Sequence, residues 1–485
     1  MTSSSPQSHP DATANASGDL QMEPPEMLAL ARETAEVLVE RIANLPSEGA
    51  WDGEFKQGLD HLMVEPPEHG SPAADVLRRA TRDILPLTLR LDHPRCFGFV
   101  PSSATWPGVL ADFLAAGYNP NTISWLVASG PSQIELVVVD WMRRWLGYPG
   151  SAGGLMTSGG SAAALNAFVA AREAAGNPER AAVYMSDQSH SAQIRAARIV
   201  GVRPECVRRV ASDAHFRLDM EALADAVAGD RAAGLHPIAV CANAGAGSTG
   251  AIDPLEPMAD YCEAENVWLH VDAAYGGFAA ITEKGRKLLQ GIERADSIGL
   301  DAHKWFFQPY EAGCLLVRNA ETLEHAFRVP HDMLQDSVWG ANHPNFSDRG
   351  LQHSRLFRAL KIWMSVQTFG MAAFRRAVSL GMELASRAEE YIDASPVLEG
   401  MTRASLGIVC FRVNPAGGGL DQASLDVVNR TVLSRVFWED RAFMSSTLVA
   451  GRFALRMCIL NHTTTWDDVR ETLEAAERFG TEALA

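Results

Sequence analysis

Residues 268–277 are Trp-Leu-His-Val-Asp-Ala-Ala-Tyr-Gly-Gly, a short apolar run that ends in the carboxylate of Asp272 and continues into small residues. The run at 267–271 has the length and composition of a buried strand. An acidic side chain directly after such a strand lies where open α/β sheets present groups to ligands. Asp272 is therefore either a carboxylate that faces a bound cation or the cap of a turn or helix.

A second apolar run ends in a polar cluster of the same kind. Residues 297–305 are Ser-Ile-Gly-Leu-Asp-Ala-His-Lys-Trp, with Lys304 near the end. A lysine after a strand is most often a surface residue. Here Trp305 and two phenylalanines follow at once, which favours a desolvated site, and desolvation favours the neutral amine that forms an imine. We therefore weigh a buried nucleophile against a surface lysine.

Outward from these two stretches, apolar runs alternate with helical segments. Runs typical of buried strands occupy 181–185, 237–242, 267–271, 297–300 and 313–317. Helical segments occupy 161–175, 219–229 and 255–265. This alternation predicts an α/β domain with a mainly parallel sheet, over about residues 92–375.

Two further elements precede Asp272. The turn Ser158-Gly159-Gly160-Ser161 opens the helix expected at 161–175. Its glycines allow close backbone approach, and the helix start offers free N–H groups and a positive dipole end, which suit a phosphate. Many helices start this way without a ligand. His190, after the strand at 181–185, is either structural or placed to stack on an aromatic group and pass protons.

The two ends of the chain differ from this middle part. Residues 1–24 are rich in small and polar residues and predict a disordered tail. Residues 25–91 have helical periodicity and predict an N-terminal helical segment. Residues 376–485, with strands expected at 406–413 and 453–460 and a helix at 465–478, predict a small α+β domain. Thr465 and Asp468 have the spacing of a capping box for that helix.

The composition excludes several classes of partner. A net charge of −17 argues against nucleic acid and anionic membrane surfaces. The sequence has no apolar run of membrane-spanning length and no signal-peptide pattern. The seven cysteines contain no C-x-x-C pair and favour neither a zinc site nor a disulfide framework. We expect a cytoplasmic protein without a metal site.

In combination, these stretches resemble the group II decarboxylases dependent on pyridoxal 5'-phosphate (PLP), the family of the aromatic-L-amino-acid, histidine, tyrosine and glutamate decarboxylases. The resemblance covers about residues 70–470, and its most specific part is the pair His270-Val-Asp272-Ala-Ala274 and His303-Lys304-Trp305. The other matching stretches are His93-Pro94 with Pro101-Ser102, Ser124-Trp125, Ser158-Gly-Gly-Ser161, Ser186-Asp-Gln-Ser-His190-Ser191, Arg358-Ala-Leu-Lys-Ile-Trp363 and Leu455-Arg-Met-Cys-Ile-Leu-Asn461.

The resemblance implies a role for each matching residue. Lys304 would form the internal aldimine, Asp272 would pair with the pyridinium nitrogen, and His190 would stack on the ring. Ala274 would pack on the opposite ring face, and His303 would lie beside the lysine. The residues expected near the phosphate are Gly159, Gly160, Ser161 and Asp301. The residues expected along the substrate pocket are Phe99, Pro101, Ser102 and Trp125.

The resemblance also implies the architecture and the reaction. The family has fold type I, with a large domain on a mainly parallel seven-stranded-type sheet, and forms homodimers with the active sites at the subunit interface and the N-terminal helices packed across it. The substrate amine would displace Lys304, CO₂ would leave, and the quinonoid would be protonated at Cα to give an amine. Apolar Phe99 and Val100 favour an L-amino acid with an aromatic or other apolar side chain.

One departure from the family pattern concerns the final proton. The family carries a mobile loop whose tyrosine is implicated in protonating the quinonoid, and alignment over 331–349 places Phe346 at that tyrosine. Phenylalanine has no proton to give. Relatives with this change are aldehyde synthases, which decarboxylate and then let oxygen produce an aldehyde, ammonia and peroxide. The alternatives are a shifted alignment or a proton from one of the histidines His331, His343 and His353.

Other departures and reaction classes stay open. Ala246-Gly247 replaces a threonine-bearing sequence and removes a hydroxyl expected near the cofactor's phenolic oxygen, and Ala162 replaces a frequent Glu without an evident reason. An aminotransferase or aldolase would share Lys304 and Asp272, and an arginine clamp on the α-carboxylate, with Arg456 as the position to inspect, would favour transamination. An inactive partner subunit is the non-enzymatic alternative.

Overall fold

The computed structural model describes residues 20–51, 58–329, 343–415 and 419–484. The chain divides into two compact units, Met1–Leu89 and Arg90–Ala485. The first unit contains α1 (Pro24–Asn44), α2 (Ala73–Arg79) and the π-helical turn η4 (Ala80–Ile84), so the helical character predicted for 25–91 is present. Most of the expected disordered tail, residues 1–19, lies outside the described residues.

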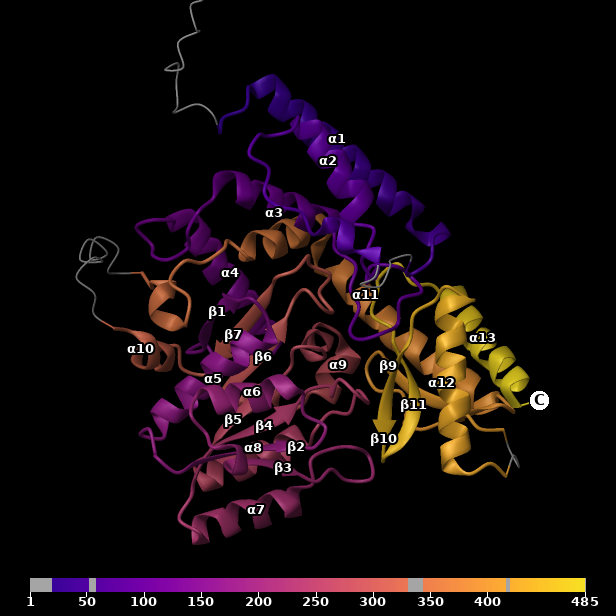
Figure 1. Ribbon diagram of the computed structural model, residues 1–485. Coiled ribbons are helices and arrows are strands. Elements are labelled where there is room, and N and C mark those ends of the chain that lie inside the picture. The colour runs from indigo at the N-terminus through magenta and orange to yellow at the C-terminus, as the bar shows by residue number, and fades with distance from the viewer. Residues whose placement is uncertain (1–19, 52–57, 330–342, 416–418, 485) are drawn as a thin grey trace, which may run out of the picture. The chain divides into compact units, whose positions relative to one another are not determined.

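The second unit is built on a seven-stranded sheet with the order β1-β7-β6-β5-β4-β2-β3 (Figure 1). β7 is antiparallel to β1 and β6, and the remaining neighbours are parallel. The predicted α/β class with a mainly parallel sheet is therefore confirmed. All five predicted runs form strands, whereas β1 and β3 were not predicted. The strands are β1 (Gly153–Thr157), β2 (Ala181–Ser186), β3 (Val207–Val210), β4 (His236–Asn243), β5 (Trp268–Asp272), β6 (Ser297–Asp301) and β7 (Gly313–Val317).

Helices pack against this sheet, and α5 packs most closely. α5 contacts β5, β6 and β7 through a face of buried alanines that includes Ala163 and Ala167. Small side chains let the helix axis approach the strands, which brings its first turn near their ends. The helices of this part of the chain are α3 (Trp106–Tyr118), α4 (Ser129–Trp145), α5 (Gly160–Ala174), α6 (Ser191–Ile199), α7 (Met220–Ala232), α8 (Leu255–Glu265), α9 (Glu283–Leu288) and α10 (Glu321–Phe327).

The C-terminal part has its own sheet and core. Its four strands are antiparallel in the order β10-β11-β9-β8, and its core includes Phe411, Leu455 and Phe479. The long helix α11 (Ala359–Ala394) kinks at Gly370, where φ is +68°, and runs through the boundary expected at 375/376. The elements of this part are β8 (Leu398–Gly400), β9 (Ile408–Val413), α12 (Gln422–Trp438), β10 (Ser445–Val449), β11 (Arg452–Cys458) and α13 (Trp466–Leu484). No helix in the described ranges is both long and apolar enough to cross a membrane.

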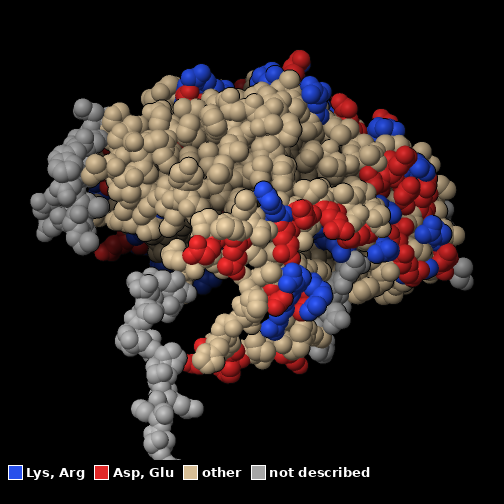
Figure 2. Space-filling model, turned by 90° about the horizontal axis from the view of Figure 1, so that it is seen from above, with Lys and Arg blue, Asp and Glu red and all other residues tan. Residues whose placement is uncertain are grey.

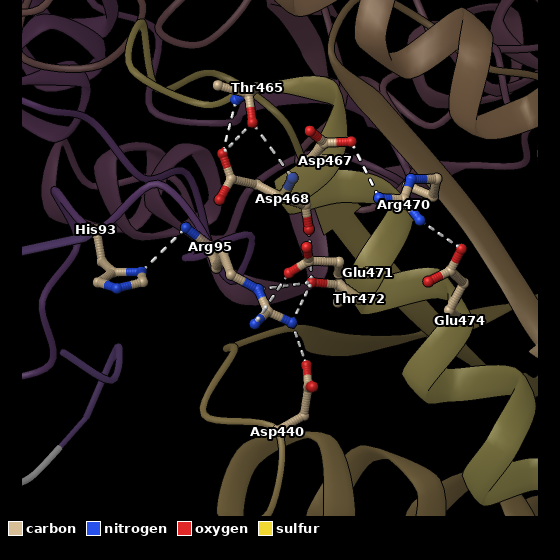
Figure 3. Close-up of polar contacts among 10 residues, drawn as sticks. All are labelled: His93, Arg95, Asp440, Thr465, Asp467, Asp468, Arg470, Glu471, Thr472 and Glu474. Atoms are coloured by element: carbon tan, nitrogen blue, oxygen red, sulfur yellow. Dashed lines mark hydrogen bonds and ion pairs between the residues drawn. The ribbon is translucent and has the colours of Figure 1, made fainter. Parts of the chain in front are cut away.

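The predicted capping box forms at the start of α13 (Figure 3). Asp468 N donates to Thr465 Oγ1 at 3.3 Å, and Thr465 N donates to Asp468 Oδ2 at 2.8 Å. The two residues thereby satisfy backbone donors that the first helical turn would otherwise leave free.

The C-terminal part of the chain also anchors the segment that contains Phe99, Pro101 and Ser102. Arg95 forms an ion pair with Asp440 and donates to Thr472 Oγ1 in α13 at 3.2 Å (Figure 3). Farther along, Ser103 Oγ donates to Asn461 Oδ1 at 2.7 Å, and Asn461 Nδ2 donates to Asp92 O at 2.9 Å. The beginning of the second unit is therefore fixed by its last hundred residues.

Candidate active site

Lys304 lies just beyond the C-terminal end of β6. Its Nζ is 3.0 Å from Oδ2 of Asp301, the last residue of that strand. A quarter of the lysine side-chain surface (25%) is exposed, whereas the Asp301 side chain is buried. Asp301 Oδ1 has no hydrogen-bond partner among the described residues. Trp305 and Phe306, two of the aromatic residues that follow Lys304, are fully buried.

The protonation state of Lys304 differs from the expectation. Burial acts to lower the pKa of Lys304, but the carboxylates of Asp301 and Asp272 outweigh it and raise the pKa above the usual range. The expectation that desolvation leaves a neutral amine is therefore wrong for the protein as described. A cation that paired with Asp272 would withdraw part of this attraction and bring the pKa of Lys304 down.

Asp272 ends β5 and is partly exposed. Gln193 Nε2 in α6 donates to Asp272 Oδ2 at 2.8 Å, and Ala274 N donates to Asp272 Oδ1 at 3.2 Å. Because β5 and β6 are parallel neighbours, their C-terminal ends bring Asp272 and Lys304 to the same edge of the sheet. Asp272 accordingly contributes to the raised pKa of Lys304.

The glycine turn meets this cluster at the start of α5. A Cβ on Gly159 would lie 3.2 Å from His303 Cε1, and a Cβ on Gly160 would lie 3.1 Å from Ala274 Cβ and 3.2 Å from Asp301 Oδ2. Larger residues would therefore intrude on the cluster. In the described structure no side chain caps the start of α5, so its first N–H groups stay available to an anion. Ser161 is exposed beside them.

Two histidines, His190 and His303, lie at this edge, and in each ring Nδ1 accepts a hydrogen bond from a backbone N–H. His303 Nδ1 accepts from Ala312 N at 3.1 Å, and His303 Nε2 lies 3.6 Å from Asp301 Oδ2. Burial lowers the pKa of His303, although Asp301 acts in the opposite direction. His190 is exposed, and its Nδ1 caps α6 by accepting from Ala192 N at 3.2 Å. In the neutral ring this contact places the proton on Nε2.

The segment expected along the substrate pocket is anchored by an arginine. Arg456 NH1 donates to Phe99 O at 2.6 Å and to Ser445 Oγ at 3.2 Å. Arg456 is buried, and its Nε and NH2 have no hydrogen-bond partner among the described residues. Phe99 is exposed, whereas Pro101 and Ser102 are buried. Arg456 therefore has two buried nitrogens, Nε and NH2, whose N–H groups have no partner among the described residues.

Trp125 is placed by a different part of the chain. Its ring stacks on His343 at a centroid distance of 3.9 Å, and its backbone N–H donates to Asn345 Oδ1 at 3.1 Å. The described residues show no contact that joins Trp125 to the Lys304 cluster. His343, one of the three alternative proton donors, is thus held against a residue expected in the substrate pocket.

Phe346 is not brought to this cluster. Its side chain is fully buried in an apolar cluster with Leu155, Leu315 and Leu323, and the guanidinium carbon of Arg355 lies 4.8 Å from its ring centroid. The expectation that Phe346 occupies a loop position at the reacting carbon is corrected by this burial. The remainder of the expected loop, 331–342 with His331, lies outside the described residues.

Sequence reasoning missed the buried ion pair that supports the glycine turn. Arg355 NH2 donates to Glu135 Oε1 at 2.5 Å and to Met156 O at 2.9 Å, while Met156 N donates to Glu135 Oε1 at 2.8 Å. Both charged side chains are almost fully inaccessible. Because Met156 lies in β1, two residues before Ser158, the pair fixes the strand that leads into the turn. Glu135 gives no signal in the sequence beyond one charge in a helix.

The two other departures have different outcomes. Near Ala246, the Ser248 hydroxyl donates to Gln188 Oε1 at 2.9 Å, so a hydroxyl is present two residues farther on and is bound to the turn before His190. Nothing in the structure explains Ala162, which lies in the first turn of α5.

Comparison with known proteins adds independent findings. The family model described as "Pyridoxal-dependent decarboxylase conserved domain" matches residues 56–414. The aromatic-L-amino-acid decarboxylase of Bacillus atrophaeus is 37% identical over 464 residues, which are 94% of this chain and 96% of that protein. The phenylacetaldehyde synthase of Arabidopsis thaliana is 31% identical over 423 residues, which are 84% and 86% of the two chains.

Among solved structures, the crystal structure of Oryza sativa TDC with PLP and tryptamine matches with a TM-score of 0.91 at 26% identity. The match covers 96% of this chain and 99% of that one. Similar proteins therefore include some named as decarboxylases and others named as aldehyde synthases.

Proposed function

The chain belongs to the pyridoxal-dependent decarboxylase family, and from that premise we propose that it converts an L-amino acid with an aromatic or other apolar side chain into the corresponding amine and CO₂. Pyridoxal 5'-phosphate is the cofactor. The observation that carries the proposal is the placement of Lys304 and Asp272 at the ends of two neighbouring parallel strands, beside the uncapped start of α5.

The residues present fit this cofactor. The uncapped α5 start and the close approach at Gly159 and Gly160 suit the phosphate. Asp272 accepts only uncharged donors in the described residues and is the carboxylate that would face the ring nitrogen. Lys304 is the attachment point. We assign His190 to one ring face and Ala274 to the other, in keeping with the exposed His190 ring and the closeness of Ala274 to the glycine turn.

When bound, PLP supplies the electron sink that accepts the electron pair of the breaking carbon–carboxylate bond. The chain has to prepare Lys304 and to manage the protons. Asp301 holds the lysine amine as a cation. A cation bound to Asp272 would weaken the attraction of that carboxylate for Lys304 and lower the pKa of Lys304 toward the neutral, nucleophilic form. His190 Nε2–H is an exposed donor at the same edge of the sheet.

Substrate recognition is assigned to the segment 99–102 and to Arg456. The exposed Phe99 ring supports an aromatic or other apolar side chain. The Nε and NH2 groups of Arg456, buried and without a partner in the described residues, have the chemistry to bind a carboxylate side-on if the substrate reaches them. An arginine that holds the α-carboxylate favours transamination, whereas the family membership and the His190 and His303-Lys304-Trp305 context favour decarboxylation.

The alternative function is oxidative: decarboxylation followed by reaction with oxygen, which gives an aldehyde, ammonia and peroxide. It is favoured by the similarity to the Arabidopsis thaliana phenylacetaldehyde synthase. The buried position of Phe346 removes the argument from that residue. Among the alternative proton donors, His343 stacks on Trp125 and His353 is exposed.

Product analysis of the holoenzyme tests the proposal. With a panel of L-amino acids, we expect CO₂ and amine in equal amounts, in air and without oxygen, and the best rates with aromatic substrates. Aldehyde, ammonia and peroxide that disappear without oxygen would establish the alternative. A 2-oxo acid without CO₂ would establish transamination and contradict both.

Phe346→Tyr separates the structural interpretation from the loop alignment. Because Phe346 lies in an apolar cluster, a new hydroxyl there has no evident partner and is expected to lower the free energy of unfolding by about 1–3 kcal/mol without changing the ratio of amine to aldehyde. Urea denaturation and product analysis measure the two effects. A shift toward amine at unchanged stability would restore the loop assignment.

We also assign the chain to a homodimer in the cytoplasm. On α3, Phe113 and Tyr118 expose 64% and 84% of their surface, together with Leu110 and Leu114, and α1 buries none of its residues. Figure 2 shows a wide area without charged side chains on one face of the molecule. Exposed apolar side chains such as those of α3 are typical of subunit interfaces. All seven cysteines are free and buried, which suits a reducing compartment. The molar mass of the protein in solution tests this assignment, because a dimer has twice the 52.5 kDa of one chain.

A further inference from the structure

Gln193 is a buried amide that contacts the Asp272 carboxylate. It lies in the first turn of α6, only 1% of it is exposed, and its Nε2 donates to Asp272 Oδ2 at 2.8 Å. Only the amide nitrogen can donate to a carboxylate, so this contact also sets which way the amide is turned. Its Oε1 is buried without a partner among the described residues. The hydrogen bond from Nε2 to Asp272 is therefore the one that fixes the Gln193 side chain, since Oε1 has no partner of its own in the described ranges.

The contact acts on Asp272 without neutralising it. Gln193 occupies Oδ2 and Ala274 N occupies Oδ1, so each oxygen has one uncharged donor and the carboxylate cannot rotate without losing both. Hydrogen bonds to the ionised form of a carboxyl group favour that form. In a pair formed by a carboxylate and a pyridine nitrogen, such donors favour the arrangement in which the nitrogen keeps the proton.

The same helical turn carries a second site residue. His190 is the N-cap of α6, three positions before Gln193, so the two side chains lie in one turn. A change that moves this turn would move the His190 ring together with the Gln193 amide. The first turn of α6 therefore carries both the exposed His190 ring and the Gln193 amide, which binds Asp272 at the end of β5.

We infer that Gln193 is a positioning residue that holds the Asp272 carboxylate correctly turned toward the ring nitrogen of PLP. The inference rests on the proposed function, in which Asp272 faces that nitrogen. Gln193 itself need not touch the cofactor. Its effect should therefore be visible in how tightly the cofactor is held and in whether the ring nitrogen is protonated.

The first test removes the amide and keeps the volume. In Gln193→Leu, we expect the cofactor dissociation constant of the holoenzyme to rise roughly 10–100-fold, as for one lost hydrogen bond to a charged group. With ring-¹⁵N-labelled PLP, the nitrogen resonance should move toward the unprotonated position. A side chain that only filled space would leave both readouts unchanged in Gln193→Leu.

The second test makes the contact depend on pH. In Gln193→Glu, the new carboxyl donates to Asp272 while it is protonated and repels Asp272 once it is ionised. Burial and the Asp272 charge raise the pKa of this new carboxyl, so the cofactor should be held normally at low pH and progressively lost as the pH rises. Wild type, measured over the same range, should not show this loss.

The other titratable groups near Asp272 are not expected to cause a loss of cofactor over the same pH range. They are Lys304, His270 and Cys241. Burial lowers the pKa of His270 to about 4, while burial raises the pKa of Cys241 well above its usual value. The pKa of Lys304 is also raised, since its two carboxylates outweigh burial. Between about pH 6 and 8 the new carboxyl is therefore expected to dominate the difference from wild type.

Two control variants separate the possible failures. Arg195→Leu, on the exposed side of α6, should leave cofactor affinity and the nitrogen resonance unchanged. Asp272→Asn should disturb both. If Asp272→Asn leaves the resonance at its wild-type position, the proposed role of Asp272 fails. If Asp272→Asn disturbs it but Gln193→Leu matches wild type, the inference on Gln193 is overturned. Should Gln193→Leu not fold, the pH dependence of Gln193→Glu decides alone, and a profile parallel to wild type overturns the inference.

Discussion

Replacing Lys304 with alanine is expected to abolish turnover, with a fall in kcat/KM on the order of 10⁴-fold or more, the scale seen when a nucleophile is removed from an active site. Lys304 is the proposed attachment point of PLP and the amine whose pKa the two carboxylates control. Without it, the cofactor can still bind through the α5 start and Asp272, but not covalently. The visible absorbance of the bound cofactor should shift to that of the free aldehyde.

The control for this variant is another lysine. Lys284 lies exposed on α9, and Lys284→Ala should keep both activity and absorbance. Lys304→Ala also leaves the buried Asp301 without its cation, so a loss of stability is expected and is measured by urea denaturation. Wild-type turnover and absorbance in Lys304→Ala would contradict the proposed function as a whole.

The largest effect on stability is expected from Glu135→Ala. This change leaves Arg355 charged and buried without its carboxylate, which costs about 3–5 kcal/mol in the free energy of unfolding. It also removes the acceptor of Met156 N in β1. Urea denaturation with saturating PLP measures the loss. Because β1 leads into the glycine turn, cofactor affinity should fall as well.

An exposed ion pair and a double variant give the comparison. Arg403, whose side chain is 84% exposed, pairs with Glu389, and Arg403→Ala should cost less than about 1 kcal/mol. Replacing both buried partners, as Glu135→Leu with Arg355→Met, removes the unpaired charge and should recover part of the stability. A loss in Glu135→Ala no larger than in Arg403→Ala would show that the buried pair contributes little.

The sheet was predictable where strands are uniformly apolar. The runs that became β2, β4, β5, β6 and β7 bury nearly every residue, so continuous hydrophobicity marked them. β1 begins with two glycines, and a Cβ on Gly154 would lie 2.0 Å from Leu315 O, so glycine is needed there for β7 to approach. The same glycines interrupt the apolar run, and β1 was therefore not recognised as a strand in the sequence. β3 is an edge strand with two arginines at its centre, which a strand buried on both faces would exclude.

The site was predictable where its chemistry is local in the chain. Asp272, Lys304 and the glycine turn follow strands or open a helix, so the rule that ligands meet strand ends located them. Gln193 and Glu135 act through partners 79 and 220 residues away, and no local pattern announces such contacts. Phe346 was misplaced because an alignment of a loop assigns a position but not the direction in which a side chain points.

The anchoring of residues 92–103 by the end of the chain has a consequence during synthesis. Ser103 finds its partner Asn461 358 residues later. At about 5–20 residues per second, a ribosome needs roughly 20–70 s to cover that distance. The sheet between them is finished earlier, because its last strand, β7, ends at Val317. The nascent chain therefore contains all seven strands of the large sheet before it contains Asn461, the residue that anchors the segment proposed to line the substrate site.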